Sequence, residues 1–141
     1  MFAPWKLWSC CIAMIIVGST LPWTEIEFYP GWDRVQWVPF TVITSVRRLA
    51  LDIVINIGIY LPFGYFAPFV MRERSRLTRL VIITFLALIL STAIETYQVF
   101  NPYRYPTVAD IIMNVTGAVV GATFSLFKSI YRPAFLATQV R

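Results

Sequence analysis

Two long apolar stretches of this chain each carry a pair of polar side chains at helical spacing. Glu95 and Gln98 are three residues apart near the end of one stretch, and Asp110 and Asn114 are four apart near the start of the next. Each pair therefore lies on one face of its helix. An ionisable group inside a spanning helix costs on the order of 3 kcal/mol unless it faces a protein interior or a wet cavity. These residues are therefore candidates for a functional site.

A third polar pair and an arginine are expected at the same edge of the membrane. Asp52 and Asn56 are again four residues apart, near the start of an earlier apolar stretch. Arg104 lies in the short, proline-containing segment 101–107, which joins the two stretches described above. Helices that alternate in direction would bring all of these groups to one end of a bundle.

The polar cluster has two main interpretations. In the first, it binds a membrane lipid, a lipid-linked glycan or an amphiphilic antibiotic at the outer leaflet, and the apolar tail of the ligand lies along the helices. The binding residues are then Asn56, Gln98, Arg104 and Asn114. In the second, the protein is an enzyme that acts on an envelope lipid, with Glu95 and Asp110 as general acid and base. No nucleophile motif or phosphate-binding loop accompanies the two carboxylates.

Three further alternatives stay open. The same polar residues could simply hydrogen-bond one another and fix the hairpin between the last two helices. Glu95 and Asp110 could ligate a divalent cation through oxygen, although no other ligand spacing supports this and the chain has no histidine. A proton path would need polar residues across the whole membrane. We rank binding first and predict neither a metal nor a cofactor.

The composition is that of a membrane protein. Of 141 residues, 58% are hydrophobic and only 13% are charged, which is too apolar for a soluble domain of this length. The net charge of +5 does not indicate nucleic acid, because the basic residues are scattered at the ends of apolar stretches. Cys10 and Cys11 are adjacent, which favours two thiols over a disulfide.

Four segments are long enough to span a bilayer, which needs roughly 20 residues. They cover residues 5–21, 49–70, 80–99 and 108–127. The first has no small-residue cleavage site and is expected to be a retained helix. The sequence therefore predicts an all-α membrane protein, in which residues 1–141 form one domain: a bundle of four transmembrane helices with a long outer aromatic loop between helices 1 and 2.

The distribution of lysine and arginine predicts the orientation. One side carries Lys6, Arg72, Arg74, Arg76, Arg79, Lys128, Arg132 and Arg141, and the other carries Arg34, Arg47, Arg48 and Arg104. The richer side is expected in the cytoplasm, with both termini, so the polar edge faces outward. The pair Arg47 and Arg48 is the evidence against this orientation.

Two further features concern packing. The loop of residues 22–48 is rich in Trp, Tyr and Phe, so we expect it at the membrane surface, either roofing the polar cluster or forming a passive aromatic collar. Gly117 and Gly121 form a GxxxG pattern, which suits close packing against another helix of this chain or against a second copy. Pro62 could kink the second helix or be tolerated there.

Four ordered blocks of residues carry a family resemblance over residues 36–121. They are Gln36-Trp37-Val38-Pro39-Phe40; Asn56-x-x-x-Tyr60-Leu61-Pro62-Phe63-Gly64; Ser91-x-x-x-Glu95-x-x-Gln98-x-Phe100; and Arg104 with Asp110-x-x-x-Asn114-x-x-Gly117-x-x-x-Gly121. Together they resemble the VanZ-like family of small bacterial membrane proteins, whose founding member is associated with teicoplanin resistance. The resemblance implies a multi-pass protein of the bacterial cytoplasmic membrane with a role in the cell envelope.

This chain departs from the family pattern at two points. Thr107 stands where many relatives have an acidic residue, three positions after the arginine. Some relatives also carry a histidine in the outer part of the chain, whereas this sequence has none. Chemistry based on histidine is therefore excluded here.

Overall fold

The computed structural model describes residues 3–41 and 45–128, and this part of the chain is helical. Its four α-helices are α1 (Pro4–Thr20), α2 (Val46–Val70), α3 (Arg76–Gln98) and α4 (Val108–Lys128). Two short 3-10 helices, Trp23–Glu25 and Trp32–Arg34, lie between α1 and α2. The predicted all-helical chain with four helices is confirmed. Arg132 and Arg141, which entered the predicted orientation, lie outside the described residues, as do residues 42–44 of the predicted loop.

Two helices begin earlier than hydropathy predicts, because serine side chains cap them. The Ser45 Oγ accepts the backbone N–H of Arg48, and the Ser75 Oγ accepts that of Thr78, each at 3.1 Å. Such caps satisfy an N–H group that the first helical turn leaves without a partner. As a result, α2 begins at Val46 rather than residue 49, and α3 begins at Arg76 rather than residue 80.

Three helices, α2, α3 and α4, are long and apolar enough to cross a membrane. The chain is therefore a membrane protein. Helix α1 has only 17 residues, which gives a length of about 25 Å at about 1.5 Å per residue, slightly less than a hydrocarbon core of about 30 Å. That α1 also crosses stays a prediction.

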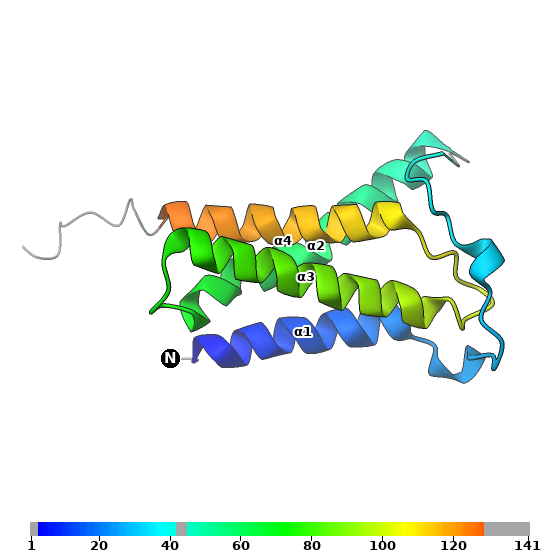
Figure 1. The fold of residues 1–141 in the computed structure, drawn as a ribbon, viewed down its shortest axis with the longest axis horizontal. Helices are drawn as coiled ribbons and strands as arrows, with labels where there is room; N and C mark the ends of the chain where they lie inside the picture. Colours follow the sequence, from blue (N-terminus) through cyan, green and yellow to red (C-terminus); the bar gives the residue numbers. More distant parts are fainter. Residues whose placement is uncertain (1–2, 42–44, 129–141) are drawn as a thin grey trace, which may run out of the picture.

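The helices lie side by side, with α2 running diagonally behind α3 and α4 (Figure 1). The start of α1 and the end of α4 lie at one end of the bundle, together with the turn between α2 and α3. The turn between α3 and α4 lies at the opposite end, together with the segment that connects α1 to α2. This second end, called the polar end below, carries the residues singled out in the sequence.

The closest contact between helices is that of α2 with α4, and glycines make it possible. A Cβ atom at Gly117 or Gly121 would clash with carbonyl oxygens of the α2 backbone, and one at Gly64 would clash with the Ala118 carbonyl oxygen. Without Cβ atoms the two backbones approach directly. The GxxxG pattern thus packs two helices of the same chain.

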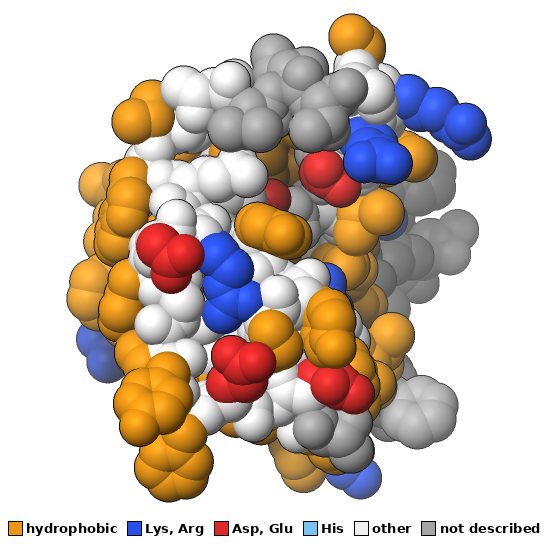
Figure 2. Space-filling model, turned by 90° about the vertical axis from the view of Figure 1, so that its right-hand side faces the viewer, with side chains coloured by type: hydrophobic (Ala, Val, Ile, Leu, Met, Phe, Trp, Pro, Cys, Tyr) orange, Lys and Arg blue, Asp and Glu red, His pale blue; other side chains and the backbone are white. Residues whose placement is uncertain are grey.

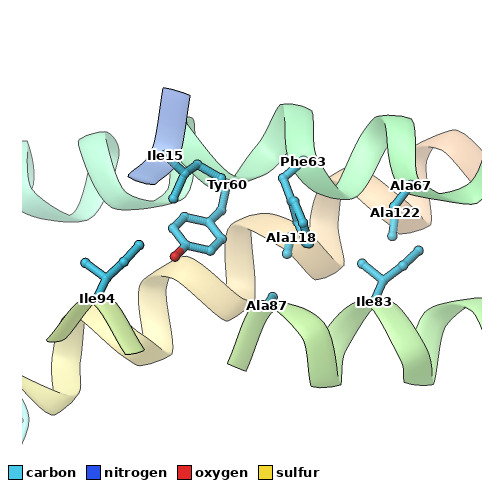
Figure 3. Packing of buried hydrophobic residues seen from close by; sticks show 9 residues of the cluster. All are labelled: Ile15, Tyr60, Phe63, Ala67, Ile83, Ala87, Ile94, Ala118 and Ala122. Carbon is cyan, nitrogen blue, oxygen red and sulfur yellow. The ribbon is translucent and has the colours of Figure 1, made fainter. Parts of the chain in front are cut away.

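All four helices contribute to the apolar core (Figure 3). Its buried members are Ile15 from α1, Tyr60, Phe63 and Ala67 from α2, Ile83, Ala87 and Ile94 from α3, and Ala118 and Ala122 from α4. Many large hydrophobic side chains on the outside stay exposed, as expected where the surrounding solvent is lipid. The core thus fixes the helices whose ends form the polar end.

Candidate functional site

Backbone hydrogen bonds tie the connecting segment, residues 21–41, to the turn between α3 and α4. The bonds run from Glu27 N to Phe100 O (2.8 Å), Gly31 N to Val99 O (2.9 Å), Gln36 N to Pro106 O (2.9 Å) and Val108 N to Gln36 O (3.2 Å). These bonds could not be predicted from the sequence, because backbone groups make them and almost every residue type has the same backbone groups. The connecting segment is therefore part of the polar end, and its position at the membrane surface stays a prediction.

Two of the predicted binding residues connect the polar end to the end of α1. The Gln98 Nε2 donates a hydrogen bond to the carbonyl oxygen of Ser19 at 2.9 Å. The Arg104 Nη2 donates to the carbonyl oxygen of Leu21 at 3.0 Å. Both side chains thus fasten the α3–α4 turn to the residues that leave α1.

Glu95 fastens the start of α4. Its side chain is only 7% exposed, and its Oε2 accepts the backbone N–H of Thr107 at 2.9 Å. The Thr107 Oγ1 in turn accepts the backbone N–H of Ala109 at 3.0 Å. A carboxylate at this place also interacts favourably with the positive end of the α4 dipole. These contacts support the hairpin-fixing role for Glu95.

Asp110 joins α4 to α2. Its Oδ1 accepts a hydrogen bond from the Asn56 Nδ2 at 2.6 Å, and the contact is partly buried. Asp52 lies one helical turn before Asn56 on α2, is exposed, and lines the same cavity as Asp110. The two aspartates and the asparagine therefore form one group between the starts of α2 and α4.

A deeper polar group lies inside the bundle. The Asn114 Nδ2 donates to the Ser91 Oγ at 2.9 Å, and both side chains are buried. The Asn114 Oδ1 and the Tyr60 hydroxyl oxygen are buried without a hydrogen-bond partner among the described residues. This group links α4 to α3 and lies further from the polar end than Asp110.

Two small cavities open at the polar end. The acidic crevice, of about 70 Å³, is lined by Asp52, Asp110, Gln36, Phe40 and Thr107 with apolar residues of α2 and α4. The tryptophan cavity, of about 100 Å³, lies between α3, α4 and the connecting segment, and Glu95 and Thr107 line it.

Trp32 and Trp37 also line the tryptophan cavity, and their rings stack with centroids 6.4 Å apart. Glu95 lines this cavity, whereas Asp110 lines the acidic crevice. Thr107 lines both cavities, so it lies between the two carboxylates.

The surface of the polar end mixes acidic, basic and hydrophobic side chains (Figure 2). The sequence predicted Asp52 at this edge but not as one of the binding residues. It also did not predict that Gln36 and Thr107 line a cavity.

Among the residues that the structure describes, no three His, Cys, Asp or Glu side chains are grouped so as to hold a metal ion.

Of the comparisons with known proteins, the one with protein families gives a match. No curated protein and no solved structure matches this chain significantly. The model of the VanZ/LLP1 family matches residues 5–130, which is nearly the whole chain. This match confirms the resemblance carried by residues 36–121 and extends it over α1 and over the whole of α4. The chain therefore belongs to the VanZ/LLP1 family.

Proposed function

We propose that this protein binds an amphiphile of the bacterial cell envelope, with the head group of the ligand in the acidic crevice. The ligand is a membrane lipid, a lipid-linked glycan or a glycopeptide antibiotic such as teicoplanin. One observation carries the proposal: Asp52 and Asp110 line a cavity at the polar end of a membrane bundle, next to lipid-exposed helices.

The lining of the crevice suits a head group that donates hydrogen bonds. The carboxylates of Asp52 and Asp110 accept hydrogen bonds from hydroxyl, amide or ammonium groups, and charged acceptors make the stronger bonds. Asn56 holds the Asp110 carboxylate in place through their 2.6 Å hydrogen bond. Phe40 and Met113 add apolar surface. A tail can then follow the exposed hydrophobic side chains of α2, such as Val54, which is 67% exposed.

The proposal includes an orientation in the bacterial cytoplasmic membrane. Both termini lie in the cytoplasm, so the acidic crevice faces the outer leaflet. The turn between α2 and α3 supports this, because it and the first turns of α3 hold four arginines at the end opposite the crevice.

A binding role has more support than a catalytic role in which Glu95 and Asp110 act as general acid and base. The two carboxylates line different cavities, and an oxygen of Glu95 already accepts the Thr107 backbone N–H. Gln98 and Arg104 bond to backbone carbonyl groups near the end of α1. In this proposal, Gln98 and Arg104 hold the walls of the site rather than contacting the ligand.

Mass spectrometry of the intact protein, extracted from its membrane in detergent, tests the proposal. We expect the wild type to retain an envelope amphiphile and the double variant Asp52→Asn, Asp110→Asn to lose it. The asparagine at position 110 can still accept the Asn56 hydrogen bond, so the variant should fold. The matched control is Glu25→Gln, Glu27→Gln, which removes the same charge from acidic residues that do not line the crevice. A bound mass that survives equally in both variants would rule out the acidic crevice.

A further inference from the structure

A second crevice lies at the opposite end of the bundle, between the start of α3 and the end of α4. Its volume is about 260 Å³ and its wall is mostly apolar, with one threonine and one cation. The lining residues are Arg76, Leu77, Leu80, Thr123, Leu126 and Phe127. Leu77 and Phe127 are more than half exposed, so the crevice opens toward the lipid side of the helices. We call it the basic-end crevice.

Positive charge gathers around the basic-end crevice. Arg72, Arg74, Arg76 and Arg79 occur within eight residues, with Glu73 as the one acidic residue among them, and Lys128 ends α4 beside Phe127. The arginines do not all have the same task.

Arg79 shapes the turn between α2 and α3. Its Nε donates to the carbonyl oxygen of Arg74 at 2.7 Å, and its Nη2 donates to that of Arg72 at 2.8 Å. The side chains of Arg72, Arg74 and Arg76 are exposed. Arg76 lines the crevice, and the turn adds the exposed cations Arg72 and Arg74 within four residues of it in the sequence.

We propose that the basic-end crevice binds an anionic phospholipid, with one acyl chain between α3 and α4 and the phosphate at Arg76. Charge complementarity selects this occupant, because basic pockets between membrane helices favour anionic head groups. The apolar wall accepts methylene groups, which a soluble anion does not offer. This inference is independent of the proposed function of the polar end.

The test is the thermal unfolding midpoint of the full chain in detergent during titration with defined lipids. Dioleoyl phosphatidylglycerol should raise the midpoint at concentrations at which dioleoyl phosphatidylcholine has little effect. Glycerol phosphate, which has the anionic group without acyl chains, should not raise it. Equal effects of the two lipids, or a full effect of glycerol phosphate, would overturn the proposal.

Two pairs of variants locate the effect. Arg76→Gln should weaken the apparent affinity for phosphatidylglycerol about fivefold, because one basic residue near an anionic lipid is worth about that factor. Arg47→Gln removes the same charge at the polar end and should leave the affinity unchanged. Thr123→Phe fills the crevice and should also weaken binding, whereas Thr116→Phe, on an exposed part of α4, should not. Equal effects within either pair would refute the assigned place.

Discussion

The polar residues of the polar end have different tasks, which their hydrogen bonds reveal. Glu95 accepts a backbone N–H at the start of α4, whereas Asp110 accepts a side-chain N–H from α2. Asn114 bonds to Ser91 deeper in the bundle. Helical spacing in the sequence was enough to place these residues on inward faces. It could not separate their tasks, because the partner of a side chain depends on how each helix is rotated against its neighbours.

The first prediction concerns Glu95. Replacing it by leucine leaves the partly buried Thr107 N–H without its acceptor, which should lower the free energy of unfolding by about 1–3 kcal/mol. Glu95→Gln keeps an oxygen acceptor and should cost clearly less. Thr96→Leu changes the neighbouring exposed position and serves as the control. The free energy of unfolding of the three variants is measured by titrating the protein in detergent with sodium dodecyl sulfate. If leucine and glutamine at position 95 cost the same, Glu95 does not cap α4.

At the scale of the elements, the contact between α2 and α4 places Asn56 beside Asp110. Glycines on both helices bring the two backbones together, and the starts of these helices then form two walls of the acidic crevice. The sequence predicted the helices from their apolar runs and the GxxxG pattern from its glycines. It did not show which helix the glycines meet. The sequence also did not predict that α2 begins at residue 46 and α3 at residue 76. Hydropathy placed both starts later, and a serine cap fixes each start in the structure.

The second prediction compares three glycines. Gly117→Ala and Gly121→Ala place a Cβ atom against the α2 backbone, and such overpacking should cost about 1–3 kcal/mol. Gly58→Ala is the matched control, because its Cβ atom would meet nothing within 4 Å. This variant should be neutral or stabilising by up to about 1 kcal/mol, since alanine favours a helix. The midpoints of thermal unfolding in detergent give the order of stability of the three variants. A loss of stability in Gly58→Ala as large as in Gly121→Ala would contradict the assigned packing.

At the scale of the whole molecule, the bundle has a polar end and a basic end. The start of α1 and the end of α4 share the basic end (Figure 1). The count of lysine and arginine predicts that this end is cytoplasmic. The structure adds that backbone hydrogen bonds join the connecting segment and the α3–α4 turn into one unit across the other end. The sequence could not reveal this unit, because backbone groups far apart in the chain join it.

The third prediction concerns the orientation in the membrane. Single cysteines at Glu27 and Tyr103, in a background without Cys10 and Cys11, should react with an impermeant thiol reagent on intact spheroplasts. Tyr103 is 73% exposed, so access does not require unfolding. A cysteine at Glu73, which is exposed in the turn between α2 and α3, should react only after the membrane is permeabilised. Labelling of position 73 alone on intact cells would invert the orientation.

Photocrosslinking in the living membrane tests the binding proposal most directly. A photoreactive phenylalanine analogue at Phe40 lines the acidic crevice, whereas the same analogue at Phe85, which is 60% exposed on α3, samples the surrounding lipid. We expect the Phe40 position to capture an envelope amphiphile that is absent from the Phe85 adducts, and we expect Asp52→Asn with Asp110→Asn to abolish this capture. An identical set of bulk lipids at both positions, unchanged in the double variant, would contradict the proposal that the crevice holds a specific ligand.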